Sequence, residues 1–300
     1  MDQLHRFRGC LLGLAVGDAV GTTVEFRPRG SFEPLADMIG GGPFGLLPGQ
    51  WTDDTSMTLC LATSLVERRG FDATDQMDRY CRWAEAGYLS STGRCFDIGN
   101  TVAAALRRYK TTEEPFSGST DSRSAGNGSI MRLAPVPMYF FPSYDDAIHY
   151  AAESSRTTHG AQECVDACRL LAAILFRALE GRGKEDVLFA DHDFDGSEGI
   201  VAIARGTYRN KSIEEIRGTG YVVECLEAGL WCFLHTETFE KAILTAANLG
   251  DDADTTAAVC GQVAGAYYGV VGIPRHWLGT LSMRAEITTL ADRLYETEPA

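Results

Sequence analysis

The chain has 300 residues, 45% of them hydrophobic and 23% charged, with no low-complexity tract, which is typical of a globular protein with a large core. Its formal net charge of −14, from 41 acidic against 27 basic residues, argues against a surface that grips a phosphate backbone. We therefore expect no nucleic-acid partner. Helical domains of this length with one core are common, so we expect a single domain over residues 1–300.

The nine cysteines form no CxxC pair, and most lie in apolar helical stretches, where a reduced thiol packs as a small hydrophobe. An odd count, with no charged-then-apolar leader, predicts a cytoplasmic location. No apolar run approaches the roughly 18 residues that a transmembrane helix needs, so we expect no membrane span. No heptad or edge-strand pattern demands a partner, and we expect a monomer.

Helical periodicity begins at once, over Leu4 to Val20. Glycines stand four residues apart at positions 9, 13, 17 and 21, which places them on one helical face and predicts the close approach of a second helix. A connection rich in Gly and Pro follows over residues 22–50. Helical patterns then occupy residues 56–69, 74–87, 98–109, 161–179, 199–208, 221–233, 238–248, 255–268 and 284–296. Because convincing period-2 alternation is absent, the predicted fold class is all-α.

Two short acidic clusters, TDDT at residues 52–55 and DDADT at residues 251–255, each immediately precede a helical pattern. Asp and Thr are good N-cap residues, so helix capping accounts for one such residue in each cluster. Four or five carboxylates at two converging helix starts would repel one another unless a cation lay between them. The all-oxygen side chains favour Mg²⁺ or Mn²⁺ over Zn²⁺. On spacing alone, capping and metal binding are equally open.

The stretch Gly-Asn-Gly-Ser at residues 126–129 precedes an apolar run and offers open backbone N–H groups at which a phosphate could bind. It lacks the Lys of a P-loop and does not match GxGxxG, so a plain turn explains it better by itself. A lone histidine such as His159 more often packs or caps than catalyses. Since spacing yields no Ser-His-Asp or Cys-His arrangement, carboxylates with bound metal are the strongest catalytic candidates.

Seven motifs span nearly the whole chain: GCLLGLAVGDAVGTTVEF, WTDDTSMTLCLA, FDIGNTVAAAL, AGNGSIMRLAP, THG before a long helix, GYVVECLEAGL and NLGDDADTTAAVCGQVAGAYYG. In this order they resemble the ADP-ribosylglycohydrolase family, especially bacterial members similar to dinitrogenase-reductase-activating glycohydrolase. The resemblance implies a compact orthogonal bundle of helices with two neighbouring divalent ions, Mg²⁺ or Mn²⁺. It also implies an ADP-ribosylated protein as substrate and ADP-ribose as product.

The resemblance further implies roles for individual residues. The family's metal-binding positions correspond to Thr52, Asp53, Asp54, Asp252, Asp254 and Thr255. Glu25 matches a carboxylate close to the metals and Asp97 matches one near the scissile bond, so either can be the general base. Positions that contact ADP-ribose correspond to Asn100, Gly126, Asn127, Gly128, Ser129, Met131, His159 and Tyr221. Asp251 stands where relatives often have Gly and is left out.

The implied reaction is hydrolysis without a covalent intermediate, in which the metals hold the distal ribose and orient a water while a carboxylate assists its attack. We expect ADP-ribosyl-arginine as substrate because FDIGN resembles the arginine-directed bacterial type. ADP-ribosyl-serine and O-acetyl-ADP-ribose stay open, since THGAQ lacks the second histidine of the nitrogenase-regulating type. The alternatives are a non-catalytic ADP-ribose-binding or crystallin-like member of the same fold, and a phosphohydrolase on an unrelated helical fold.

Overall fold

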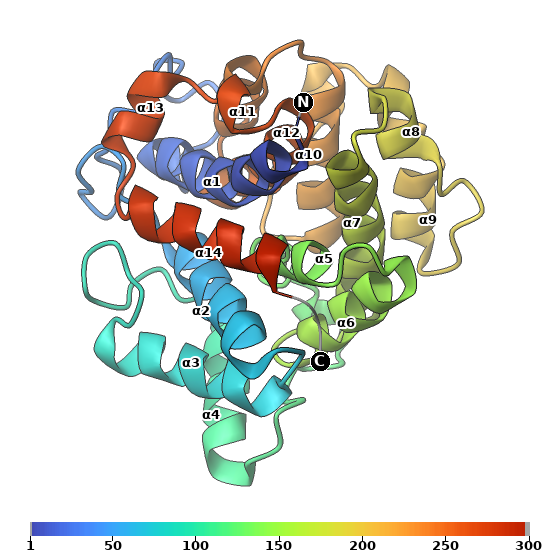
Figure 1. Ribbon diagram of the computed structural model, residues 1–300. Coiled ribbons are helices and arrows are strands. Elements are labelled where there is room, and N and C mark those ends of the chain that lie inside the picture. The colour runs from blue at the N-terminus through green and yellow to red at the C-terminus, as the bar shows by residue number, and fades with distance from the viewer. Residues whose placement is uncertain (1, 298–300) are drawn as a thin grey trace.

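The computed structural model describes residues 2–297, and its regular elements are all helical (Figure 1). The α-helices are α1 Gln3–Gly21, α2 Asp53–Arg68, α3 Ala73–Ala86, α4 Asn100–Thr112, α5 Pro135–Tyr139, α6 Tyr144–Arg156, α7 Gln162–Glu180, α8 Lys184–Phe189, α9 Glu198–Ala204, α10 Val222–Leu234, α11 Phe239–Ala247, α12 Ala253–Tyr268, α13 Arg275–Thr280 and α14 Arg284–Glu296. Extended backbone pairing between residues 2 and 297 is limited to three isolated bridges. The all-α prediction is confirmed.

Each predicted helical stretch corresponds to a helix, but four helices are missing from the prediction. Three of these, α5, α8 and α13, have five or six residues and are too short to show a period. The fourth, α6, has 13 residues, and its fully buried positions carry only alanines and serines, so no large apolar residue marks them in the sequence. The helices α2 and α12 also begin earlier than predicted, at Asp53 and Ala253, so most of the two acidic clusters lies in the first helical turn instead of before it.

The helices α1 and α12 run antiparallel with their backbones in close contact, as the glycine spacing predicts. A Cβ added at Gly9 would lie 2.2 Å from the carbonyl oxygen of Gly265, and one at Gly17 would lie 2.1 Å from that of Ala257. The two other glycines of the series meet α12 in the same way. Any larger side chain would force the helices apart. This packing holds Asp18, near the end of α1, beside the first turn of α12.

Within residues 2–297, one stretch is long and apolar enough to span a membrane by length and composition, namely Gln3–Val24, with a mean hydropathy of 1.2. The prediction that no apolar run reaches this length is therefore wrong. The reason is that leucines, valines and alanines keep the mean hydropathy high although glycines and a few charged residues interrupt the run. Because 89% of the apolar window is buried inside the protein, we identify α1 as a core helix.

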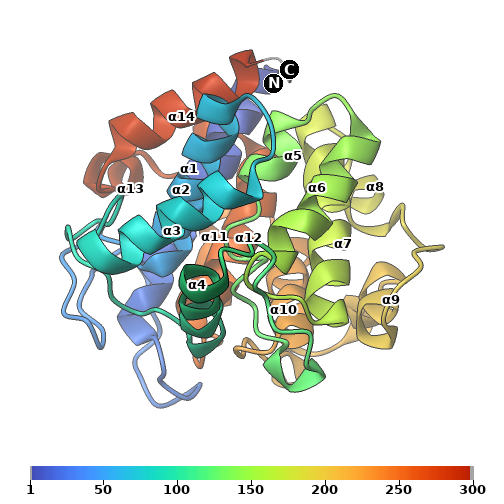
Figure 2. The ribbon, with the colours of Figure 1, turned by 90° about the horizontal axis from the view of Figure 1, so that it is seen from below.

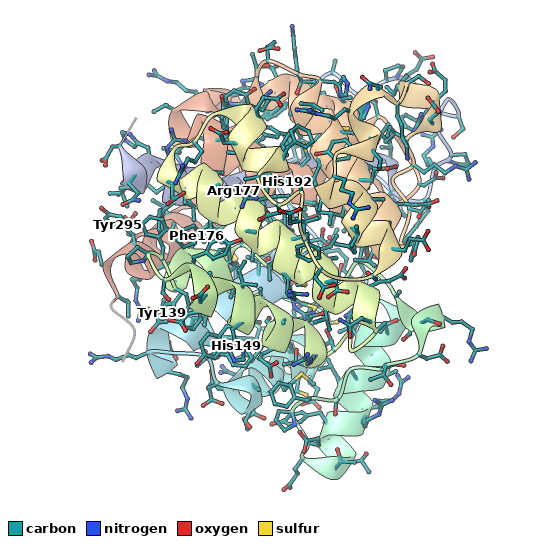
Figure 3. All side chains as sticks on the ribbon, turned by 90° about the vertical axis from the view of Figure 1, so that its right-hand side faces the viewer. Tyr139, His149, Phe176, Arg177, His192 and Tyr295 are labelled. Carbon is teal, nitrogen blue, oxygen red and sulfur yellow. The ribbon has the colours of Figure 1, made fainter. Side chains whose placement is uncertain are left out.

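The other helices pack around this central pair. In Figure 2, α4 faces the viewer between the α2–α3 pair on one side and α10 on the other. The helices α2, α3 and α4 share a small apolar cluster that includes Tyr80 and Trp83, separate from the main core. On a different side of the molecule (Figure 3), Phe176 of α7 packs against Tyr144 at the start of α6, with ring centroids 5.3 Å apart. A single domain over residues 1–300 stays a prediction.

Candidate active site

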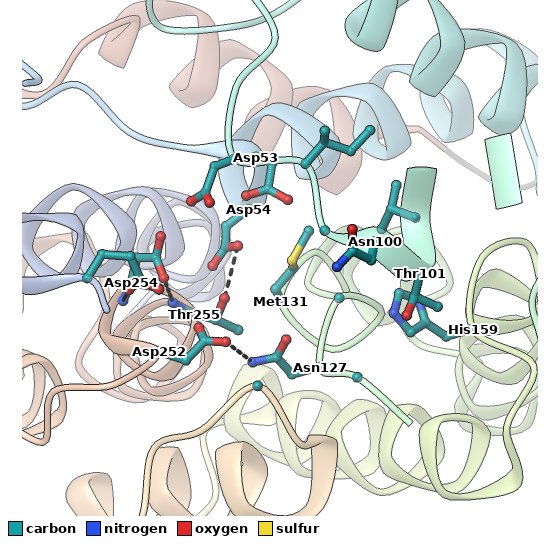
Figure 4. A pocket seen from close by; sticks show the side chains of 18 of the residues that line it. Asp53, Asp54, Asn100, Thr101, Asn127, Met131, His159, Asp252, Asp254 and Thr255 are labelled. Atoms are coloured by element: carbon teal, nitrogen blue, oxygen red, sulfur yellow. Dashed lines mark hydrogen bonds between the residues drawn. The ribbon is translucent and has the colours of Figure 1, made fainter. Parts of the chain in front are cut away.

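A cleft of about 470 Å³ lies where the N-terminal ends of α2, α4 and α12 meet the loop that contains residues 126–131. It brings together most of the predicted site residues, namely Glu25, Asp53, Asp54, Asp97, Asn100, Gly126, Asn127, Gly128, Met131, His159, Asp252, Asp254 and Thr255. Figure 4 shows Asp53, Asp54, Asp252 and Asp254 on one side of the cleft and Met131, Asn100 and His159 on the other. The carboxylates of residues 25, 53, 54, 97, 252 and 254 are called the acidic end here. Residues 126–131 with His159 are called the loop end.

The first turn of α2 is capped by a residue from another helix, the fully buried Asp18 of α1. Its Oδ1 accepts hydrogen bonds from the backbone N and the hydroxyl of Thr52, both at 2.9 Å. Its Oδ2 accepts from the backbone N and the hydroxyl of Thr55, at 3.0 and 2.6 Å. Thr52 occupies the N-cap position but its own side chain makes no cap bond. The capping explanation for the TDDT cluster is therefore wrong, because α1 supplies the cap.

The first turn of α12 is capped in the same manner by Glu25, which follows the end of α1. Its Oε2 accepts hydrogen bonds from the backbone N of Ala253 at 2.8 Å and of Asp254 at 3.1 Å. Asp252 holds the N-cap position without a side-chain cap bond. In both acidic clusters, the cap comes from outside the helix and leaves the cluster's own carboxylates facing the cleft.

The acidic end has the properties of a cation site. Ligand atoms of Glu25, Asp252 and Asp254 all lie within 4.8 Å of one another. The Oδ2 atom of Asp54 is buried and has no hydrogen-bond partner, although its Oδ1 accepts a bond of 3.2 Å from the Thr255 hydroxyl. Among the described residues no lysine or arginine lines the cleft. The side chains at the acidic end offer only oxygen atoms as ligands, and one buried carboxylate oxygen has no partner. Both features suit the binding of hard divalent cations.

Burial and mutual repulsion raise the pKa values of the carboxyl groups at the acidic end. Burial first, and then neighbouring carboxylates, raise the pKa of Asp53 and of Asp54 well above the usual value. Burial raises the pKa of Asp254 to about 7, although hydrogen bonds oppose the shift. Burial, followed by the negative charges of Asp53 and Asp254, raises the pKa of Asp97 to about 11. Without a cation the protein therefore resists ionising all of these groups together.

Asp97 reaches the cleft from a strained turn just before α4. Its φ of 59° lies in the left-handed region that few residues other than Gly and Asn adopt. No backbone N–H of the described residues donates to its carboxylate, in contrast to Asp18 and Glu25. Its carboxylate is thus available for a ligand or a water.

The loop end faces the carboxylates across the cleft. The Asn127 side chain joins the two ends, because its Nδ2 donates to Asp252 Oδ2 at 3.1 Å. A Cβ added at Gly128 would lie 2.8 Å from Cε1 of His159, so a larger residue at this position would displace the imidazole from the loop. Burial, followed by the charge of Arg132, lowers the pKa of His159 to about 3. The histidine is therefore neutral at physiological pH.

Three predicted residues do not line the cleft. Thr52 lies beneath the acidic end, between Asp18 and the Oδ2 of Asp254, 3.3 Å from the latter. Ser129 is buried, and its hydroxyl has no partner. Tyr221 bridges Gly126 through its backbone, but its hydroxyl donates to Glu163 at the surface.

The structure also places residues in or under the cleft that the sequence patterns did not identify. Phe26, Ile98, Thr101, Val102 and Gly220 line it. Asp18 lies below it and orders the first turn of α2. The available signal for Asp18 was its position as the one acidic residue within the glycine-rich helical stretch of residues 4–20.

Comparisons with known proteins agree with this geometry. The profile of the ADP-ribosylglycohydrolase family matches residues 1–300. The chain is 43% identical over 298 residues to a protein of Serratia proteamaculans (strain 568) named ADP-ribosylarginine hydrolase Tri1, a match that covers 99% of this chain and 81% of that protein. It is 33% identical to the ADP-ribosyl-[dinitrogen reductase] glycohydrolase of Rhodospirillum rubrum, over 94% of this chain and 92% of that protein.

A solved structure described as an ADP-ribosylglycohydrolase-related protein complex superposes with a TM-score of 0.88 at 43% identity and covers 99% of both chains. Sequence and fold thus agree over nearly the full length. The chain belongs to the ADP-ribosylglycohydrolase family, enzymes that hydrolyse the glycosidic bond to ADP-ribose.

Proposed function

We propose that this enzyme releases ADP-ribose from arginine side chains of modified proteins and that it uses two divalent ions, Mg²⁺ or Mn²⁺. The observation that carries the proposal is the acidic end, where clustered carboxylates and an unpartnered buried oxygen of Asp54 face the cleft. The name of the Tri1 relative supports the arginine linkage. ADP-ribosyl-serine and O-acetyl-ADP-ribose are the linkages to test against it.

The residues that would hold the ions are those of the two helix starts that line the cleft, Asp53, Asp54, Asp252, Asp254 and Thr255. Their oxygen donors match the preference of Mg²⁺ and Mn²⁺. Thr52, the sixth predicted ligand, lies beneath them and holds Asp254 through its hydroxyl. Bound ions would supply Lewis-acid polarisation and a more acidic water. The caps from Asp18 and Glu25 would preorganise both helix starts, because each fixes backbone N–H groups that otherwise attract these carboxylates.

We assign the general base to Asp97 rather than to Glu25. One oxygen of Glu25 already accepts two backbone hydrogen bonds, which fixes it as a cap. Asp97 carries no such bond and lines the cleft. Cations bound at the acidic end would offset the neighbouring negative charges and lower the raised pKa of Asp97. The ionised carboxylate can then accept a proton from the attacking water, while the negative charges around it stabilise the positive charge that develops on the ribose. The loop end would bind the remainder of ADP-ribose.

The decisive experiment is hydrolysis of a protein carrying ADP-ribosyl-arginine, with free ADP-ribose measured by mass spectrometry. The chain would be assayed with Mg²⁺, with Mn²⁺ and with a chelator, beside the Asp53→Asn/Asp254→Asn variant. The Asp251→Asn variant is the matched control, because Asp251 is exposed and belongs to the same cluster as Asp254. We expect metal-dependent release that the double variant loses and the control keeps.

Release from ADP-ribosyl-serine or O-acetyl-ADP-ribose alone would overturn the arginine assignment and leave the hydrolase intact. Release that is unaffected by chelation and by the double substitution would overturn the metal assignment. Tight ADP-ribose binding without release from any of the three substrates would support the non-catalytic alternative.

We also propose a cytoplasmic, monomeric protein. The cytoplasmic assignment is supported by the cysteines, all nine of which are free thiols in the part of the chain that the structure describes. Seven of them are buried in the helical core. Size-exclusion chromatography with light scattering would test the oligomeric state.

A further inference from the structure

Behind the loop end lies a buried cation that the proposed reaction does not use. Arg132 is 1% exposed, and no carboxylate of the described residues pairs with it. Its guanidinium lies over the ring of Tyr80, 4.7 Å from the ring centroid. Since an unpaired buried charge is costly, the neutral acceptors around Arg132 must compensate for it. One of these acceptors belongs to the wall of the cleft and another contacts a residue of that wall.

The first acceptor leads to His159. Nη2 of Arg132 donates to Oγ1 of Thr158 at 2.7 Å, and this oxygen lies 2.9 Å from Nδ1 of His159. Arginine can only donate, so the Thr158 hydroxyl accepts this bond and has one proton left. Thr158 is fully buried, and its hydroxyl proton has the imidazole Nδ1 as its partner. Nδ1 is therefore the acceptor, and the proton of the neutral ring must be on Nε2.

The Nε2 atom of His159 lies against the glycine loop and has no hydrogen-bond partner in the described part of the chain. The imidazole lines the cleft. The backbone of His159 is fixed as well, because its N–H donates to Ser155 O at 2.7 Å and its carbonyl accepts from Ser155 Oγ at 2.8 Å. The ring thus presents one unused N–H at the cleft wall.

The second acceptor is the loop itself. Nη1 of Arg132 donates to the carbonyl of Gly128 at 2.9 Å. In a trans peptide the C=O and N–H groups point in opposite directions, so the N–H of Ser129 points away from Arg132. Neither this N–H nor that of Gly128 donates to any described residue. The loop end therefore has a surplus of donors, which suits an anionic ligand.

We propose that Arg132 and Thr158 are positioning residues that hold His159 in the Nε2–H tautomer, so that it donates a hydrogen bond to an oxygen of bound ADP-ribose. The inference rests on ADP-ribose as the ligand and not on the arginine linkage. Arg132 also orients the Gly128–Ser129 peptide toward the same ligand. The buried guanidinium of Arg132 thus causes both His159 and the Gly128–Ser129 peptide to present N–H donors to the cleft.

The test compares Thr158→Val with Thr158→Ser. A direct substitution of Arg132 would leave several acceptors unpaired and is less clean. The side-chain nitrogen shifts of His159 in ¹⁵N-labelled protein report the tautomer without any ligand. Calorimetric titration with ADP-ribose in Mg²⁺ buffer reports binding. We expect the Nε2–H pattern in the unmodified chain and in Thr158→Ser, its loss in Thr158→Val, and about tenfold weaker ADP-ribose binding in Thr158→Val only.

A double-mutant cycle with His159→Ala separates positioning from a structural role. If Thr158 acts through His159, Thr158→Val should cause no further loss of affinity in the His159→Ala background. The same loss in both backgrounds would overturn the proposal, as would an Nδ1–H tautomer in the unmodified chain. Because the tautomer and ADP-ribose affinity are measured without turnover, a failed arginine assignment leaves this test unaffected.

Discussion

At the acidic end of the cleft, acceptors outnumber donors, whereas at the loop end donors outnumber acceptors. The buried Oδ2 of Asp54 has no partner, and no cationic side chain lines the cleft near it. Across the cleft, the N–H groups of Gly128 and Ser129 and Nε2 of His159 have no acceptor among the described residues. The acidic end therefore lacks a cation or donor, and the loop end lacks an acceptor. A divalent cation together with a phosphate-bearing sugar would supply both.

The pKa shifts of the two ends show the same difference. Burial raises the pKa of the carboxyl groups and lowers that of His159. In each case burial favours the neutral form of the group. The two ends are nevertheless connected, since Asn127 of the loop donates to Asp252. The comparison predicts that substitutions at the acidic end affect chemistry and metal binding, whereas those at the loop end affect ligand affinity.

The largest expected effect is that of Asp97→Asn. Loss of the proposed base should reduce kcat by about 10²- to 10⁴-fold, while the Kd for ADP-ribose changes by less than about threefold. Single-turnover kinetics and calorimetry would measure the two quantities. Equal losses of kcat and of ADP-ribose affinity would contradict the proposal that Asp97 acts in the chemical step and not in ligand binding.

A second effect concerns the stability of the metal-free protein. The pKa of Asp254 is raised to about 7, above its value in the unfolded chain, so the folded state binds more protons between about pH 4 and pH 7. The protonated carboxyl group of Asp254 therefore contributes to stability at low pH, and this contribution is lost as the pH rises through 7. In a chelator, Tm should therefore fall by roughly 5 °C from pH 5 to pH 8.

Mg²⁺ should reverse this trend, because cation binding stabilises the ionised carboxylates. Calorimetric scans with and without Mg²⁺ would measure both curves. A metal-free Tm that rises over the same pH range would show that the clustered carboxylates are not strained by mutual repulsion.

A smaller effect is expected at the cap of α2. Asp18→Asn replaces an acceptor of two bonds by an NH₂ group that faces two donors, and should lower the free energy of unfolding by about 2 kcal/mol. Asp72→Asn is the matched control, since Asp72 caps α3 through one backbone bond at the surface and Asn caps equally well. Its effect should stay below about 0.5 kcal/mol. Urea denaturation would measure both variants, and equal losses would refute the special role of Asp18.

The smallest effect belongs to the loop end. Because the pKa of His159 is lowered to about 3, its protonation should not contribute to ADP-ribose binding between pH 5 and pH 8. The ratio of the affinities of the unmodified chain and His159→Ala should stay constant over this range. A ratio that changes near pH 6.5 would show that His159 titrates as an ordinary histidine and would remove the contrast between the two ends.

Local patterns in the sequence were sufficient for the helical fold and for the close pairing of α1 with α12. Glycines four residues apart define one helical face regardless of what packs on it. The helix α6 was missed because its fully buried positions carry only alanine and serine, so no large apolar residue marks them in the sequence. The acidic clusters could be found by composition, but their placement in the first turns of α2 and α12 could not.

The sequence by itself determined the all-α class, the family and which carboxylates to consider. Only the tertiary structure decided which carboxylates cap helices and which face the cleft. That division depends on Asp18 and Glu25, which reach α2 and α12 across 34 to 229 residues of chain. It likewise showed that a buried Arg132 and Thr158 stand behind His159. A sequence pattern records spacing along one helix, whereas hydrogen bonds and charge repulsion depend on distances between helices that only folding sets.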